Sequence, residues 1–548
     1  MRGAVAFAAA CMAALTLLAP SAARADDVTF DFTESLFADW HWTLDDAQLA
    51  PDRRHDVIDL RNRLNARMRW NQNTFGLRLD AAVFTAPPSS QYQNDVRPEE
   101  MFIGGEHPGG WRWVAGDDYL TVGRGMALSL RKFDEIGFTT SLRGAHLIYT
   151  GGPIGFRVGV GLTNVVNVDL VEEKLVPDPL DLVALARVDI PLGKTVGVGA
   201  HVVDLERRHS GLRNAITGLL GDDDDDALSG RKYIRSLVGG ADVHVNGIAD
   251  AVDLFAEFDY LVNDETRATL AGDVPAGKDG SALYVSASGT FGATGVLLEG
   301  KRYDHYDVRS SPHPDTFDQQ SITQTFPYIA PPTLERIDQR VVNNTDVTGV
   351  HLRVDHALGD GDFKKPRHSI FASAAFFADA PAQNEWTFHG YMGFERTTPD
   401  GMRLQLQMGF RQEEAPREDI IRLRMVHLDL DWFAVITPGV DLQLHWTHEF
   451  RDKNIGAPSL QEGYAEGTFY LSVNLPPHWS VTGQFEYLTD DATERPMFPG
   501  GFLQYKLDSQ SFIRLFVGRS KGGLKCSGGI CRVFPNFDGL KLEATLRF

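Results

Sequence analysis

Apolar and polar residues alternate one by one over much of the chain. Residues 403–410 read Arg-Leu-Gln-Leu-Gln-Met-Gly-Phe, and a similar alternation recurs in 253–259, 350–355 and 441–447. Successive side chains of a strand point to opposite faces, so each segment predicts a β-strand with one apolar and one polar face. No convincing long segment has the 3.6-residue period of a helix, and the fold class is therefore predicted to be all-β. Near 419–434 the alternation changes phase at Met425-Val426, which predicts a β-bulge there.

Residues 539–548 show the alternation most clearly. Leu540, Leu542, Ala544, Leu546 and Phe548 are apolar, and the four residues between them are polar. A strand with lipid on one face and water on the other is the unit of a transmembrane β-barrel. The phenylalanine at position 548 also resembles the signature by which bacterial outer-membrane proteins are recognised for assembly.

The connections between the predicted strands fall into two classes. Short turns rich in Gly, Pro, Asn and Asp, such as 71–73, 116–118 and 437–439, have hairpin chemistry. Longer polar connections lie between them, near 86–108, 166–181, 207–231, 262–280, 306–346, 451–465 and 520–537. The two classes alternate, as in outer-membrane barrels with short periplasmic turns and long external loops. A soluble β-sandwich also has alternating strands, but it has no reason to keep all its long loops at one end.

The expected architecture is a large antiparallel barrel of about 22–24 strands. The least certain strands are 30–43, 109–116 and 367–379. An even number of strands predicts that both termini lie in the periplasm. We expect no separate plug domain, because few residues separate the predicted leader from the first strong strand, at 59–70.

The first 25 residues predict a signal peptide. A positive start is followed by an apolar stretch from Ala4 to about Ala19, and Ala23-Arg24-Ala25 matches the cleavage pattern. We therefore expect a single barrel over 26–548, located in the bacterial outer membrane. After residue 25 no apolar run reaches the roughly 18 residues that a membrane-spanning helix needs.

The composition of the chain limits the classes of molecule that it is expected to bind. The formal net charge of −21 argues against a nucleic-acid partner. The expected partners are outer-membrane lipid, lipopolysaccharide and the barrel-assembly machinery, together with a polar or anionic solute. We expect no cofactor and no metal site.

Four sequence segments resemble an uncharacterised family of predicted bacterial outer-membrane proteins. They are 116–128 (GDDYLTVGRGMAL), 131–144 (RKFDEIGFTTSLRG), 330–336 (APPTLER) and 522–532 (GGLKCSGGICR). The resemblance implies a barrel in the outer membrane and implies no activity. The segment 119–144 is unusually polar for a barrel strand, and it is expected to fold partly inward as a constriction.

A row of arginines is the main candidate site. Arg61, Arg63, Arg67 and Arg69 share one face of a predicted strand, and Arg78 follows on the next strand. Opposite an apolar, lipid-facing set, these side chains would face the lumen and favour anions. The alternative is structural: the arginines pair with inward carboxylates, such as Asp253, Glu257 and Asp259, and brace a filled barrel.

Two further features concern the predicted external loops. Cys526 and Cys531, separated by four residues, are the only cysteines after the predicted signal peptide, and in an oxidising compartment they predict a disulfide. The acidic run 222–226 could bind Ca²⁺, but it lacks the ligand pattern of a calcium loop and is better interpreted as a solvated loop.

The sequence favours a channel or conduit for polar solutes, of the porin type or for polymer export. The first alternative is a loop-filled barrel that acts as a surface anchor or binding protein. A barrel enzyme is the weaker alternative. Histidines occur at His356, His445 and His448, but no catalytic motif accompanies them, and we predict no enzymatic activity.

Overall fold

The structure is a computed structural model of the chain. It describes residues 28–42, 57–85, 94–133, 138–169, 174–175, 178–207, 231–269, 272–275, 278–309, 327–334, 346–359, 366–379, 385–416, 420–457, 461–490, 496–527, 530–534 and 536–548. The predicted signal peptide, Cys11 and the acidic run 222–226 lie outside these ranges. In the described part of the chain, no helix is long and apolar enough to cross a membrane.

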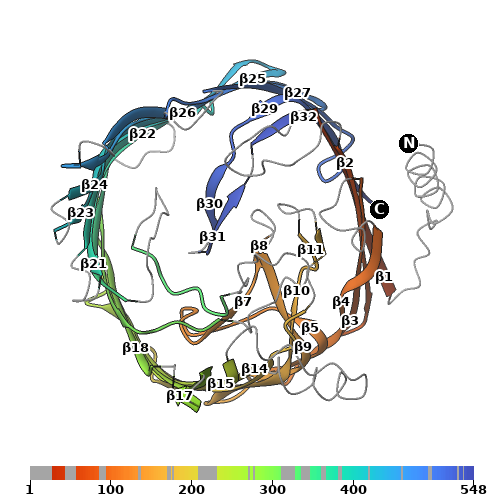
Figure 1. The fold of residues 1–548 in the computed structure, drawn as a ribbon, viewed down its shortest axis with the longest axis vertical. Helices are drawn as coiled ribbons and strands as arrows, with labels where there is room; N and C mark the ends of the chain where they lie inside the picture. The colour runs from red at the N-terminus through yellow and green to blue at the C-terminus, as the bar shows by residue number, and fades with distance from the viewer. Residues whose placement is uncertain are drawn as a thin grey trace.

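Twenty-four antiparallel strands close into a barrel, which confirms the all-β fold and the upper value of the predicted strand number (Figure 1). The first twelve wall strands are β1 (Val28–His41), β2 (Val57–Trp70), β3 (Asn73–Phe84), β4 (Asn94–His107), β5 (Trp111–Asp118), β9 (Phe138–Tyr149), β10 (Gly155–Val165), β13 (Leu182–Leu192), β14 (Val196–Arg207), β15 (Arg231–Ile248), β16 (Val252–Thr269) and β18 (Gly280–Phe291). The other twelve are β19 (Thr294–Asp304), β20 (Val347–Leu358), β21 (Arg367–Asp379), β22 (Trp386–Thr397), β23 (Arg403–Ala415), β24 (Ile420–Thr437), β25 (Val440–Ile455), β26 (Glu462–Leu475), β27 (Trp479–Leu488), β28 (Met497–Lys506), β29 (Phe512–Ser520) and β32 (Phe537–Arg547). All three least certain strands are present, as β1, β5 and β21.

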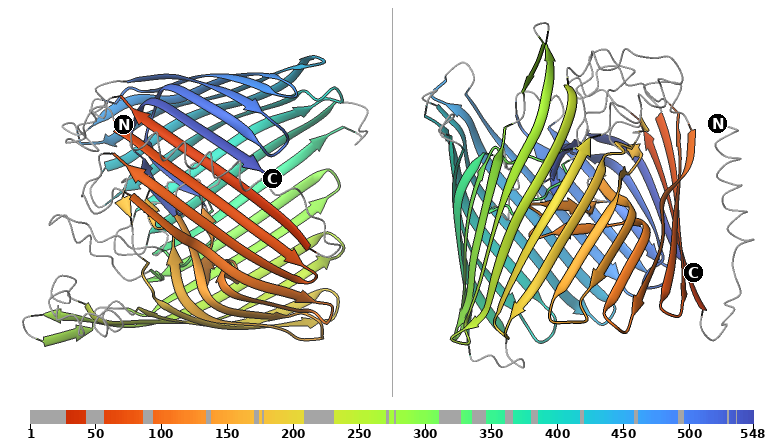
Figure 2. Two further views of the ribbon diagram at one scale, coloured as in Figure 1. Left: turned by 90° about the vertical axis from the view of Figure 1, so that its right-hand side faces the viewer. Right: turned by 90° about the horizontal axis from the view of Figure 1, so that it is seen from below.

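The first and last wall strands pair with each other and close the ring. The register of β1 on β32 runs from Thr33 opposite Arg547 to His41 opposite Gly539. The backbone of Phe548 continues the pairing, because its N–H donates to the carbonyl of Phe32 at 2.8 Å. The strands are strongly tilted, as barrel closure requires (Figure 2).

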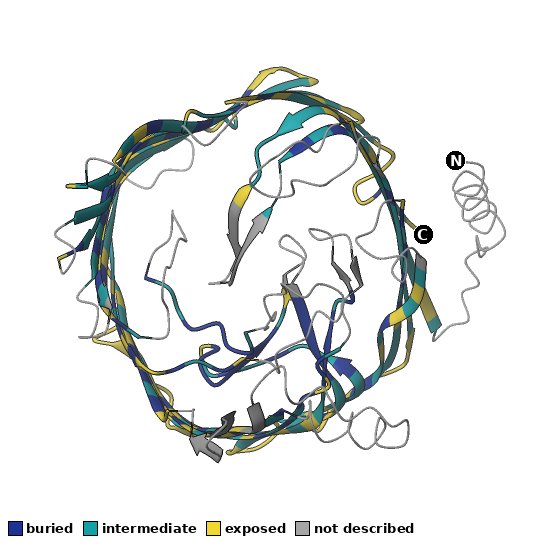
Figure 3. Ribbon diagram, in the orientation of Figure 1, coloured by how far each residue is buried: buried dark blue, intermediate teal, exposed yellow. Residues whose placement is uncertain are grey.

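The two faces of the wall are inverted relative to a soluble protein. On β16, Leu254, Phe258 and Tyr260 are at least 40% exposed, whereas Glu257 and Asp259 are at most 1% exposed. At these positions apolar side chains face outward and charged side chains face the lumen, as lipid on the outside requires. Buried and exposed residues alternate around most of the ring in Figure 3.

Three local predictions are wrong. Residues 94–107 form strand β4 rather than part of a long connection, because a bulge opposite Arg78 and Leu79 interrupts the alternation at Glu99. Residues 116–118 belong to β5 and pair with β9, so they are not a turn. The bulge of β24 lies at Arg422 rather than at 425–426. The alternation in the sequence changes phase at Met425 because this apolar residue faces the lumen, where it is 1% exposed.

Short strands lie inside the ring. The connection between β5 and β9 contains the hairpin β6 (Leu120–Val122) and β7 (Leu128–Leu130), followed by β8 (Lys132–Phe133). The other short strands are β11 (Val168–Asp169), β12 (Lys174–Leu175), β30 (Gly523–Ser527) and β31 (Ile530–Phe534), whereas β17 (Gly272–Pro275) extends the edge of β16. Figure 1 shows β7, β8, β30 and β31 within the ring. The expected inward fold is present for the first part of 119–144, whereas residues 138–144 belong to β9.

Candidate functional site: the barrel lumen

Three segments from distant parts of the sequence form a layer inside the barrel, which we call the inner layer: residues 119–131, 305–309 and 327–334. Backbone hydrogen bonds join them. The N–H of Ser129 donates to the carbonyl of Tyr328 at 2.7 Å, and that of Ala330 to Gly125 at 2.9 Å. The N–H of Tyr328 donates to Val308, also at 2.9 Å. The long connections thus fold back into the lumen as an ordered layer.

The inner layer packs against one side of the wall. Met126, Leu128 and Leu130 are at most 1% exposed. They belong to an apolar cluster that includes lumenal residues of the wall, namely Leu142, Val165, Val183, Leu185, Val203, Leu205, Val238, Leu261, Ala282, Val347, Ala375 and Phe377. These wall residues come from β9 to β21, so this half of the lumen has a hydrophobic core. We call it the packed sector.

The hydroxyl of Tyr328 forms hydrogen bonds that hold the inner layer against the wall. Its hydroxyl donates to the Asp181 carboxylate at 2.8 Å and lies 2.9 Å from Thr163 Oγ1. Burial, together with the charge of Asp181, raises the pKa of Tyr328 well above its ordinary value. The hydroxyl is therefore protonated at neutral pH and acts as a donor.

The arginine row lies on the lumenal face, and most of it is paired with carboxylates of neighbouring strands. Arg61 contacts Asp39 at 3.0 Å, and Arg63 contacts Asp80 at 3.4 Å. Arg78 is 1% exposed and bonds both Asp80, at 2.5 and 2.8 Å, and Glu100, at 3.0 Å. The carboxylates therefore come from β1, β3 and β4, adjacent to the arginines, and not from the distant β16.

Arg67 and Arg69 differ from the other three arginines. Both are exposed, and no carboxylate among the described residues forms an ion pair with either. They line a cavity of about 490 Å³ at the end of the barrel that carries the short turns, together with Asp31, Asp508 and Arg547. Asp31 binds Arg547 at 2.6 Å, which leaves Arg67, Arg69 and Asp508 as the other charged side chains of the cavity, a side-chain excess of one positive charge.

The lumenal wall opposite the packed sector is polar. Strands β25 to β29 line a groove of about 280 Å³ there, formed by Gln443, His445, Tyr470, Ser472, Ser480, Thr482, Phe502, Gln504 and Arg514. The one arginine is paired with Glu543, with Nε 3.0 Å from the carboxylate. The groove thus offers amides, hydroxyls and aromatic rings with little net charge. We call this wall the polar sector.

The histidines that the sequence suggested for catalysis do not converge. His445 faces the groove and bonds Asp431 at 2.6 Å. His448 lies three residues later on the same strand and therefore on the opposite face, where it contacts Tyr487. His356 bonds Thr294 at 2.9 Å in another part of the wall. These three histidines therefore form no common site.

Cys526 and Cys531 lie directly opposite each other in the β30–β31 hairpin. Facing positions of an antiparallel pair bring the two β-carbons within about 4.5–5.5 Å, close to the range that a disulfide needs. We predict that trypsin releases residues 526–532 as one peptide, lighter by two hydrogens than its reduced form in mass spectrometry. Two free thiols in protein from an oxidising compartment would contradict the disulfide. Because the loop is short, its reduction should change the unfolding free energy only slightly.

A protein-family model matches the C-terminal part of the chain. Residues 453–548 match the model of a family of unknown function, DUF6029. This confirms the expected resemblance to an uncharacterised family, and the matched region includes the 522–532 segment. No curated protein matches the chain.

Solved structures resemble the barrel only distantly. The siderophore receptor PirA of Pseudomonas aeruginosa shares 9% identity at a TM-score of 0.45, with 95% of this chain and 80% of that chain covered. The translocation pore of the P pilus usher PapC shares 8% identity at a TM-score of 0.40, with 95% of this chain and 99% of that chain covered. OccK3 (OpdO) of Pseudomonas aeruginosa shares 11% identity at a TM-score of 0.37, with 70% of this chain and 91% of that chain covered. At these values the comparison carries no functional argument, and the barrel is established by the strand pairing itself.

Proposed function

We propose that this protein is an outer-membrane channel for polar, mainly uncharged solutes. The observation that carries the proposal is the polar sector, where a groove of amides, hydroxyls and aromatic rings lines the lumenal wall. A barrel of 24 strands is too wide for its own wall side chains to fill, because 16–18 strands already leave an aqueous channel. The inner layer then narrows this lumen from one side, and the polar sector forms the opposite wall of the path.

The alternation of connections supports an orientation. We place the short turns and both termini in the periplasm and the long connections outside, in contact with lipopolysaccharide. A signal peptide over residues 1–25 and insertion by the barrel-assembly machinery belong to the same proposal. In this orientation the inner layer lies toward the external half of the lumen, and Arg67 and Arg69 lie near the periplasmic exit.

Planar-bilayer conductance and liposome swelling test the channel directly. We expect discrete conductance steps, and faster swelling in neutral mono- and disaccharides than in anionic sugars of equal size. Within the groove, replacing Tyr470 and Phe502 with alanine should slow the entry of neutral sugars, because aromatic rings pack against their C–H faces. If neither conductance nor swelling appears, even after the inner layer is loosened, the barrel is a surface anchor and the channel proposal fails.

The two exposed arginines should set ion preference at the short-turn end. Removing positive charge from the wall of a pore disfavours anions there. We therefore expect the double variant Arg67→Ala, Arg69→Ala to shift the reversal potential in a salt gradient toward cation selectivity. Arg302→Ala is the matched control, because Arg302 lies on the outer face of β19 between two inward residues and its loss should leave the reversal potential unchanged.

A further inference from the structure

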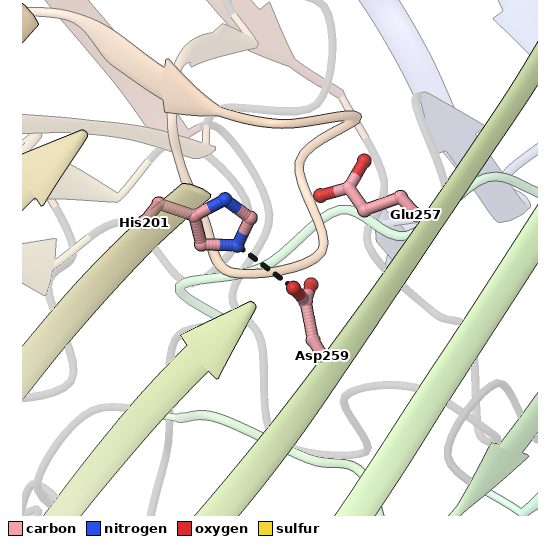
Figure 4. A group of neighbouring side chains, drawn as sticks. All are labelled: His201, Glu257 and Asp259. Atoms are coloured by element: carbon pink, nitrogen blue, oxygen red, sulfur yellow. Dashed lines mark hydrogen bonds and ion pairs between the residues drawn. The ribbon is translucent and has the colours of Figure 1, made fainter. Parts of the chain in front are cut away.

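Three side chains beneath the inner layer converge in the middle of the wall. His201 of β14 and Glu257 and Asp259 of β16 each offer one ligand atom, and the three atoms lie within 4.8 Å of one another. Figure 4 shows the three side chains directed toward one another from two strands, with a loop crossing between His201 and Glu257 in this view. Exposure is 6% for His201, 1% for Glu257 and 0% for Asp259. The two strands bring these residues together although 56 positions separate His201 from Glu257 in the sequence.

The hydrogen bonds of His201 indicate which of its ring nitrogens carries the proton. Arg187 can only donate, and its Nη1 lies 3.3 Å from His201 Nδ1, so Nδ1 is the acceptor. Nε2 then carries the proton and donates to Asp259 at 2.7 Å. In this arrangement the imidazole is neutral.

The neighbourhood therefore contains more negative than positive charge. Asp242, Glu257 and Asp259 are buried carboxylates, and Arg187, which bonds Asp242 at 2.6 Å, is the cation of this group. Three carboxylates and one guanidinium leave an excess of two negative charges when all are ionised. Buried charges are costly unless they are paired or coordinate a metal, and one divalent cation would balance this excess.

One carboxylate oxygen lacks a partner. Glu257 Oε2 accepts the backbone N–H of Arg124 at 2.7 Å, whereas Glu257 Oε1 is buried without a hydrogen bond. The inner layer approaches this carboxylate at Gly123, which has a φ of +60° and where a β-carbon would lie 1.7 Å from Oε1. A buried acceptor with no donor is costly and requires an explanation.

We propose that His201, Glu257 and Asp259 bind a divalent transition-metal ion, with Zn²⁺ as the best match. One imidazole nitrogen and two carboxylate oxygens are ligands that zinc accepts, whereas Ca²⁺ and Mg²⁺ prefer oxygen alone. The metal replaces the proton between His201 Nε2 and Asp259, and the imidazole proton moves to Nδ1. Arg187 Nη1, which lies 3.3 Å from Nδ1, must then turn away, and Asp242 Oδ2, which lies at 4.0 Å, must approach to accept that proton, as histidine ligands usually require.

The proposed ion also has a structural consequence. Glu257 holds the backbone of Arg124, and the hydroxyl of Tyr306 lies 3.4 Å from Asp259 and 3.3 Å from the carbonyl of Met126. An ion fixed by these carboxylates therefore ties two segments of the inner layer to the wall. The site does not depend on whether the lumen conducts solutes.

Metal analysis of the folded protein in detergent tests the site. After chelation and reloading with ZnCl₂, we expect one tightly held zinc per chain by mass spectrometry of the metal, and Co²⁺ should give the visible absorption of a low-coordinate nitrogen–oxygen site. Glu257→Gln, which keeps the acceptor for Arg124, and Asp259→Asn should weaken zinc binding about tenfold or more. Absence of a stoichiometric metal in folded wild-type protein overturns the proposal.

An exposed group provides the matched control. Asp304, His305 and Asp346 also lie with ligand atoms within 4.8 Å of one another, but at the surface. Asp304→Asn should leave the zinc content unchanged, and a loss of zinc in this variant would assign the ion to the surface group instead.

Hydrogen exchange gives a second measurement: removing zinc should speed exchange of the amides of 120–130 in wild-type protein. Equal exchange with and without zinc would contradict a site at Glu257.

Discussion

Replacing Leu128 with aspartate is expected to release the inner layer from the packed sector while the wall remains closed. Leu128 is 1% exposed within the apolar cluster. Loss of its packing costs about 2–5 kcal/mol, and burial of a carboxylate adds several more, so the variant layer is less stable docked than undocked. The wall keeps its interstrand hydrogen bonds, because no strand of the ring is altered. The conductance of the barrel should therefore rise severalfold.

Two measurements check this expectation. Trypsin should cleave after Arg124 and Arg131 in the Leu128→Asp variant while the wall remains resistant, and single-channel conductance should increase in the same preparation. Leu128→Met is the matched control, since it keeps an apolar side chain of similar volume and should cost less than about 1.5 kcal/mol. Tryptic resistance of 119–131 equal to that of the control would show that the cluster does not hold the inner layer.

Replacing Arg78 with methionine is expected to destabilise the whole barrel. The substitution leaves Asp80, which is 6% exposed, and Glu100 without the guanidinium that bonds both of them. Removing one partner of a buried ion pair typically costs about 3–5 kcal/mol, because the remaining charge stays desolvated. Asp80 keeps its longer contact with Arg63 at 3.4 Å and Glu100 its contact with Lys132 at 3.9 Å, so the lower part of that range applies.

Denaturant unfolding in lipid or detergent, followed by tryptophan fluorescence, gives the change in unfolding free energy. Arg69→Met is the matched control, because Arg69 is exposed on the adjacent strand and should change stability by less than about 0.5 kcal/mol. If Arg78→Met costs no more than Arg69→Met, the buried ion pairs do not brace this part of the wall.

Local sequence patterns carried most of the fold prediction. The alternation in segments such as 403–410 requires no knowledge of distant residues, because lipid on one side and water on the other act on each strand separately. The prediction failed where the local pattern was interrupted. In β4 the bulge at Glu99 breaks the period, and in β24 the apolar Met425 faces inward against the expected rule.

The candidate sites were predicted only in part. The inward orientation of the arginine row followed from the strand pattern, but its partners did not, since Asp39, Asp80 and Glu100 are set by strand register. The polar character of 119–144 indicated a constriction, yet Tyr306 and Tyr328 gave no signal, because they lie in a long connection with no period. The group at His201 was predicted only in part: Glu257 and Asp259 were expected to face inward, but His201 lies on another strand and no local pattern connects it with them.

By itself, the sequence determined the class of the molecule: a barrel of about 24 strands with an apolar outside and connections of two kinds. Side-chain alternation is a local property, so it can be recognised in the sequence without knowing which strands pair. Only the tertiary structure decided how the lumen is divided. Gly125 and Ala330 are 205 positions apart, yet they are joined by a backbone hydrogen bond, and His201 meets Glu257 only because β14, β15 and β16 are consecutive in the ring. Such contacts depend on register and loop closure, which no periodicity in the chain encodes.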